Sequence, residues 1–150
     1  MSASEVVSAA GLSIRAEASD AQRAALWLER TGTQFGVPLA AIMRLTHCVD
    51  EALANLLAYG GAGAQTDDVV LQLSVRRDGR GGEATVTVSD SGRPFNPLAV
   101  ETTPRPTVLA DAKPGGLGLV MMHSFSDGLS YRYAEDRNQL TFVVRWGGLS

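Results

Sequence analysis

Asp90 is the residue whose place in this sequence most suggests chemistry. It follows residues 83–89, in which apolar and polar residues alternate as in a half-buried strand. Asp90 has the parity of the apolar residues, so its carboxylate is predicted to point to the core, where it needs hydrogen-bond partners. The chain then turns at Gly92 and stiffens at Pro94. This arrangement is typical of a small-molecule pocket, although Asp-Ser-Gly is also ordinary turn chemistry.

Two further groups of residues could act together with Asp90. Glu51 and Asn55 are four residues apart and share one face of a predicted helix, where the plain alternative is a solvated polar face. The segment Gly115-Gly116-Leu117-Gly118-Leu119 leads into another predicted helix. Glycines before a helix N-terminus can present free N–H groups to phosphate, although a flexible loop would have the same composition.

Hydrophobic periodicity predicts the elements that must position these groups. Residues 6–18 alternate as a first strand, and Ser19 with Gln22 matches a capping box that starts a helix ending at Gly36. A second helix spans 38–59 with one apolar stripe, made of Ile42, Leu45, Val49, Ala52, Leu53 and Leu56.

The second half of the sequence reads as two hairpins separated by a loop and a helix. Residues 69–75 and 83–89 flank a glycine-rich turn, and residues 129–133 and 140–146 flank a turn predicted at 135–138. Between the hairpins lie a proline-rich loop, 98–114, and a third helix that Gly128 closes. This order predicts an α+β fold, a two-layer sandwich whose mostly antiparallel sheet is covered on one face by three helices.

Composition narrows the class of protein. The 150 residues are enough for one domain, 1–150, and the net charge of −3 gives no basic surface for nucleic acid. The single cysteine, Cys48, fits a reducing cytoplasm, and two histidines make a zinc site unexpected. We find neither a signal peptide nor an apolar run long enough for a membrane span.

The three groups occur in a fixed order, Glu51-x-x-x-Asn55, Asp90-x-Gly92-x-Pro94-Phe95 and Gly116-x-Gly118. This order resembles the N, G1 and G2 boxes that form the nucleotide pocket of the GHKL ATPase superfamily. Within it, the sequence most resembles the anti-sigma factor serine/threonine kinases, the RsbW-like group, also at Asp136-Arg137-Asn138-Gln139-Leu140-Thr141. The likeness covers nearly the whole chain and implies a Bergerat-type ATP-binding fold.

The resemblance implies a role for each motif residue. Glu51 would act as general base or orient the attacking hydroxyl, and Asn55 would ligate Mg²⁺. Asp90 would accept a hydrogen bond from the adenine amino group of ATP or ADP, and loop 98–114 would form a lid. The implied nucleotide-binding set is Asn55, Asp90, Gly92, Pro94, Lys113, Gly115, Gly116, Leu117, Gly118, Leu119 and Thr141.

The resemblance also implies an activity, a cytoplasmic serine/threonine protein kinase that uses ATP and Mg²⁺. Its substrate would be a STAS-type anti-sigma factor antagonist, and in its other state it would bind a sigma factor or equivalent regulator. The resemblance also implies a homodimer. Two alternatives stay open, a nucleotide-gated binding module without kinase activity and a histidine-kinase catalytic fragment. Asp50 stands where many histidine kinases of the superfamily carry His, and no phosphoacceptor helix pair is found in the sequence.

Overall fold

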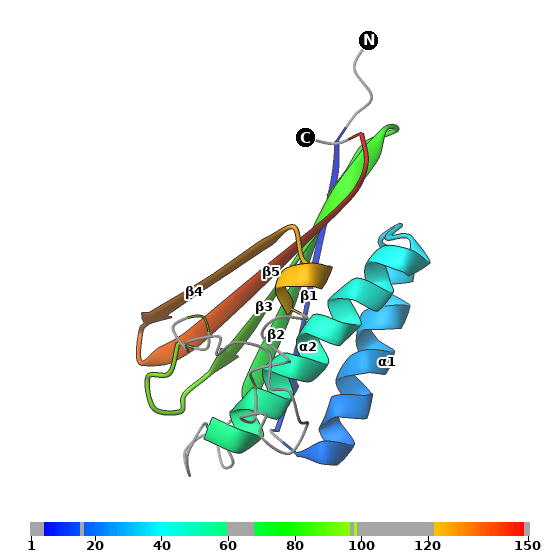
Figure 1. Cartoon of the computed structure of the whole chain (residues 1–150). Coiled ribbons are helices and arrows are strands. Elements are labelled where there is room, and N and C mark those ends of the chain that lie inside the picture. The colour runs from blue at the N-terminus through cyan, green and yellow to red at the C-terminus, as the bar shows by residue number, and fades with distance from the viewer. Residues whose placement is uncertain (1–4, 16, 60–67, 97, 99–121, 149–150) are drawn as a thin grey trace, which may run out of the picture.

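The computed structural model describes residues 5–15, 17–59, 68–96, 98 and 122–148. Two long helices lie against one face of a five-stranded antiparallel sheet of order β1-β2-β3-β5-β4 (Figure 1). A helical turn at 122–125 precedes β4. The predicted α+β sandwich is therefore confirmed. The elements are β1 (Val6–Ile14), α1 (Ala18–Gln34), α2 (Leu39–Tyr59), β2 (Val69–Arg77), β3 (Gly81–Asp90), β4 (Gly128–Ala134) and β5 (Arg137–Gly147).

Alternation along the strands places the core on one face of the sheet. In β3 the even-numbered residues from Gly82 to Asp90 are buried, while the odd-numbered residues from Glu83 to Ser89 are half-buried on the other face. The same alternation in β5 buries Leu140, Phe142 and Val144. Because side chains on a strand point to opposite faces in turn, these residues all face the helices.

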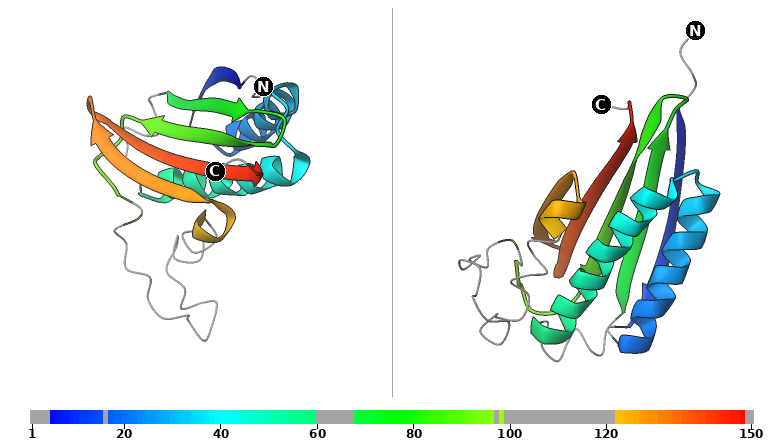
Figure 2. Two further views of the ribbon diagram at one scale, coloured as in Figure 1. Left: turned by 90° about the horizontal axis from the view of Figure 1, so that it is seen from above. Right: turned by 45° about the vertical axis from the view of Figure 1, so that its right-hand side comes forward.

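Helix α2 supplies the other half of the core. The predicted stripe is confirmed, because its members from Ile42 to Leu53 are at most 3% exposed and Leu56 packs against them. Gly36, with φ of +84°, lies just after the end of α1, and Pro38 directly precedes α2. The two views in Figure 2 show α1 and α2 running along one side of a strongly twisted sheet.

The strand register shows which segments lie together at each end of the sheet. The start of β1, the β2–β3 turn and the end of β5 lie at one end. At the opposite end, the last residue of β3, Asp90, pairs with Asn138 near the start of β5. The loop that follows β3 therefore begins beside the β4–β5 turn.

Several predicted boundaries differ from the structure. The first strand ends at Ile14, and α1 begins at Ala18, so the predicted capping box at Ser19 and Gln22 is wrong. Glu17 takes the N-cap position without a side-chain bond, and the nearby Asp20 carboxylate instead accepts the Arg15 amide at 2.7 Å.

The β4–β5 turn is also shorter than predicted. Glu135 and Asp136 both have positive φ, as in the two-residue turns that suit hairpin twist. Arg137 and Asn138 consequently belong to β5 and not to the turn, and Gly128 begins β4. Among the described residues, no helix is both long and apolar enough to cross a membrane.

We predict that Phe142→Ala, which empties a fully buried site, lowers the free energy of unfolding by about 3–5 kcal/mol. Val143→Ala, the matched change on the opposite face of β5, should cost about 1 kcal/mol or less. Urea unfolding followed by circular dichroism measures both. Equal losses from the two variants would contradict a core confined to the helical face.

Candidate functional site

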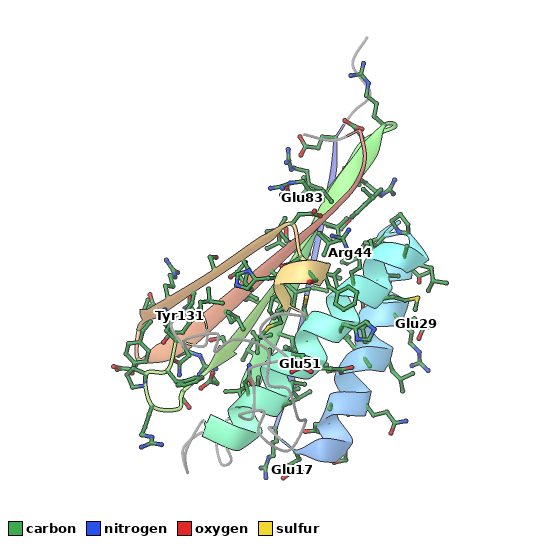
Figure 3. The ribbon with its side chains drawn as sticks, in the orientation of Figure 1. Glu17, Glu29, Arg44, Glu51, Glu83 and Tyr131 are labelled. Carbon is green, nitrogen blue, oxygen red and sulfur yellow. The ribbon has the colours of Figure 1, made fainter. Side chains whose placement is uncertain are left out.

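A pocket lies between α2 and the end of the sheet where β3 stops. It holds about 420 Å³ of space, part of it open to solvent, and three elements of structure form its walls. The sheet contributes Val88, Asp90, Tyr131, Asn138 and Leu140, α2 contributes Ala52, Asn55 and Leu56, and the loop after β3 contributes Arg93 and Phe95. Figure 3 labels Tyr131 on the β4 side of this region and Glu51 on α2.

Asp90 forms the polar centre of the pocket. Its inward parity is confirmed, because the residue is only 4% exposed. Oδ1 accepts the Gly92 amide at 2.9 Å and Asn138 Nδ2 at 3.1 Å. Among the described residues, none donates a hydrogen bond to Oδ2. Two protein donors therefore hold Oδ1, and within the described part of the chain Oδ2 has no donor.

Asn138 joins the loop after β3 to the last hairpin. Its Nδ2 also donates to the carbonyl oxygens of Gly92 and Arg93, at 3.3 and 2.9 Å. Its Oδ1 accepts the Phe95 amide at 3.0 Å and the Tyr131 hydroxyl. These bonds span two strands and the loop, so Asn138 fixes the edge of the pocket.

Tyr131 forms the β4 wall of the pocket and serves as a donor there. Loss of solvent contact raises the pKa of its hydroxyl, the Phe95 backbone opposes this shift, and the negative charge of Asp90 adds to it. The phenol therefore stays protonated at neutral pH. It can donate to Asn138 throughout the physiological range.

Asn55 reaches the same pocket from α2. It is 9% exposed, and no hydrogen bond joins its side chain to another residue in the described part of the chain. An amide oxygen is a hard ligand that Mg²⁺ accepts, and Mg²⁺ commonly takes few protein ligands together with substrate phosphates. The donor chemistry at this position fits the cation. Glu51 lies one turn earlier on α2, half-buried, and does not line the pocket.

The other predicted site residues divide into three groups. Gly92 is buried in the pocket loop, and Pro94 is exposed beside it. Thr141 lies on the opposite face of the sheet from Asn138 and Leu140, with its Oγ1 3.1 Å from that of Thr87, so the structure does not bring it to the pocket. The remaining candidates lie outside the described residues: Lys113, Gly115, Gly116, Leu117, Gly118 and Leu119, with the predicted lid beyond Leu98.

Sequence reasoning missed Asn138 and Tyr131 as pocket residues. The signal was present, because Asn138 has the parity of Leu140 and Phe142, and Tyr131 has the parity of Leu129. Placing Asn138 in a turn stopped the alternation one step too early. Their convergence depends on the register of the β4–β5 hairpin, which the two-residue turn at Glu135 and Asp136 sets.

Helix α2 also holds the helical turn at 122–125. Arg44 Nε donates to the Phe125 carbonyl at 2.9 Å, and Arg44 Nη2 lies 3.2 Å from Asp127 Oδ2. The ring of His47 stacks on Phe125, with centroids 4.9 Å apart. These contacts fix the 122–125 segment against α2, at His47, which lies one helical turn before Glu51.

Comparison with known proteins gives results that agree with this geometry. Residues 14–144 match the family model described as histidine kinase-like ATPase domain. The sequence is 31% identical over 132 residues to the serine/threonine-protein kinase BtrW of Bordetella bronchiseptica, covering 88% of this chain and 90% of BtrW.

A solved structure with a similar fold contains the RsbU and RsbW domains of Rv1364c from Mycobacterium tuberculosis. The TM-score is 0.62 at 16% identity, over 90% of this chain and 32% of that chain. The chain thus spans about a third of that protein's solved length, and the likeness concerns the fold.

Cys48 lies on α2 between His47 and Glu51, and its environment excludes it as a nucleophile. It is fully buried with its thiol 3.9 Å from the Met122 carbonyl. Burial raises the pKa of the thiol to about 11, against the opposing charge of Arg44. The reactive thiolate is therefore scarce at neutral pH.

We predict that Cys48 in the folded protein reacts with Ellman's reagent at pH 8 about a hundredfold or more slowly than in urea. Because folding raises this pKa above the usual 9.0, the stability contributed by the thiol is present below pH 9 and is lost as pH rises toward 11. Equal rates with and without urea would show that the thiol is not buried.

Proposed function

The chain belongs to the histidine kinase-like ATPase domain family, and we propose that it is a serine/threonine protein kinase that uses ATP and Mg²⁺. The observation that carries the proposal is Asp90, a carboxylate 4% exposed inside a pocket with apolar walls. Adenine is a flat aromatic bicycle whose faces suit apolar walls and whose edge carries one exocyclic amino group. It would lie among Val88, Leu140 and Leu56 and donate to Asp90 Oδ2.

Asn55 and Glu51 are the residues that would serve the chemistry. Asn55 lines the pocket from α2, and no other residue in the described ranges hydrogen-bonds its amide, so its oxygen would hold Mg²⁺ beside the phosphates. Bound Mg²⁺ supplies neutralisation of the charge on the transferred phosphoryl group. Glu51, one turn away, would orient the substrate hydroxyl and accept its proton, which contributes on the order of a hundredfold or more to the rate.

The likeness to BtrW, a serine/threonine-protein kinase, supports a protein hydroxyl as the phosphoryl acceptor. We infer that the substrate is a STAS-type anti-sigma factor antagonist and that a sigma factor or equivalent regulator is the alternative partner. The fold shared with a chain that contains an RsbW domain agrees with such a partner-switching role. We place this activity in the cytoplasm, where one buried free cysteine suits reducing conditions.

Asp90→Asn should weaken the binding of ATP about tenfold or more when Mg²⁺ is present, because it removes the charged acceptor for the amino group. Isothermal titration calorimetry measures the dissociation constant, and thermal unfolding checks that the variant is folded. Unchanged affinity in a folded variant would show that Asp90 does not contact the nucleotide.

Glu51→Gln should slow phosphoryl transfer about a hundredfold or more. ATP should still bind, because Glu51 does not line the pocket. Transfer is followed with radiolabelled ATP and a STAS-domain protein as acceptor. Glu17→Gln, an exposed change at the start of α1, is the matched control and should transfer normally. A wild-type protein that binds ATP but transfers nothing would favour a nucleotide-gated binding module, and transfer to histidine would favour a histidine-kinase fragment.

A further inference from the structure

The side-chain amide of Asn138 has one orientation that satisfies its surroundings. Around one end lie three acceptors, Asp90 Oδ1 and the carbonyl oxygens of Gly92 and Arg93. Around the other end lie two donors, the Phe95 amide and the Tyr131 hydroxyl. An amide supplies two N–H donors and one oxygen with two lone pairs. Reversing it would place oxygen against three acceptors, so its orientation is fixed.

This orientation decides which oxygen of Asp90 the protein uses. The Asn138 amide and the Gly92 amide both donate to Oδ1, and among the described residues nothing donates to Oδ2. Asp90 and Asn138 are directly paired across β3 and β5, so the strand register maintains the contact. The carboxylate is thereby held from one side and cannot turn freely in the pocket.

We propose that Asn138 is a positioning residue that sets the preference of the pocket for a purine carrying an amino group, by holding Asp90 through Oδ1 and leaving Oδ2 for the ligand. The proposal rests on the proposed function, because it takes the nucleotide to be ATP. Asn138 acts through Asp90. Without Asn138, Oδ1 keeps one protein donor, and the carboxylate can rotate to bind water.

Tyr131 completes the arrangement by holding Asn138. It stands diagonally across from Asn138 in the β4–β5 hairpin, where its register partner is Leu140. Its hydroxyl is the donor that, with the Phe95 amide, fills both lone pairs of Asn138 Oδ1. Removing this hydroxyl leaves the side-chain shape nearly unchanged and loosens the amide.

The test compares two nucleotides with each variant by calorimetry, in the presence of Mg²⁺. One is ATP, and the other is purine riboside triphosphate, in which hydrogen replaces the amino group. We expect the wild type to prefer ATP by about tenfold or more, the value of one hydrogen bond to a charged acceptor. Asn138→Ala should bind both nucleotides with similar affinity, because the preference is lost.

Three further variants separate positioning from general damage. Asn138→Asp sets a carboxylate against Asp90 and two carbonyl oxygens, and should lose more ATP affinity than Asn138→Ala. Tyr131→Phe, the mildest change, should reduce the ATP preference about threefold and decides the matter if the Asn138 variants do not fold. Gln139→Ala, on the opposite face of β5, is the matched control and should keep the full preference.

The ratio of the two affinities identifies the role. If folded Asn138→Ala or Tyr131→Phe weakens both nucleotides equally, Asn138 is only structural and the inference is overturned. If the wild type prefers ATP and the variants keep that preference, the inference also fails while the proposed function stands. A wild type that binds neither nucleotide would overturn both.

Discussion

The cross-strand contact between Asp90 and Asn138 is the interaction on which the pocket depends. Asp90 is only 4% exposed, so its carboxylate needs hydrogen-bond donors, and β5 supplies one directly opposite the end of β3. The same asparagine donates to the carbonyl oxygens of Gly92 and Arg93 in the loop after β3. One side chain therefore satisfies the buried charge and shapes the loop that borders the ligand space.

The remainder of the fold places α2 opposite this contact. A single apolar stripe fixes the rotation of α2 on the sheet, so the register of that stripe also decides that Asn55 faces the pocket. The core and the candidate site are thus two parts of one buried surface. A helix rotated by one residue would withdraw Asn55 from Asp90 and would also expose the stripe.

Much of this arrangement could be predicted from the sequence, because it follows from periodicity. The alternation in 83–89 is enough to predict that Asp90 points into the core. The apolar stripe from Ile42 to Leu56 is enough to predict which face of α2 packs on the sheet. The role of Asn138 was missed because the predicted turn covers 135–138, whereas Glu135 and Asp136 complete the turn in two residues through positive φ. The family resemblance puts Thr141 in the nucleotide-binding set, although its position in the strand alternation is opposite to that of Leu140. In the structure Thr141 lies beside Thr87 on the face away from the pocket, as the alternation predicts.

The central claim is that the pocket between α2, Asp90 and the β4–β5 hairpin holds the nucleotide. The most direct measurement is an NMR titration of the wild-type protein with Mg²⁺ and a non-hydrolysable ATP analogue. We expect, among the residues described here, the largest shifts at the Gly92 and Phe95 amides and at the side-chain amide of Asn138. Saturable shifts confined to the far end of the sheet, near Arg77 and Trp146, would contradict the claim.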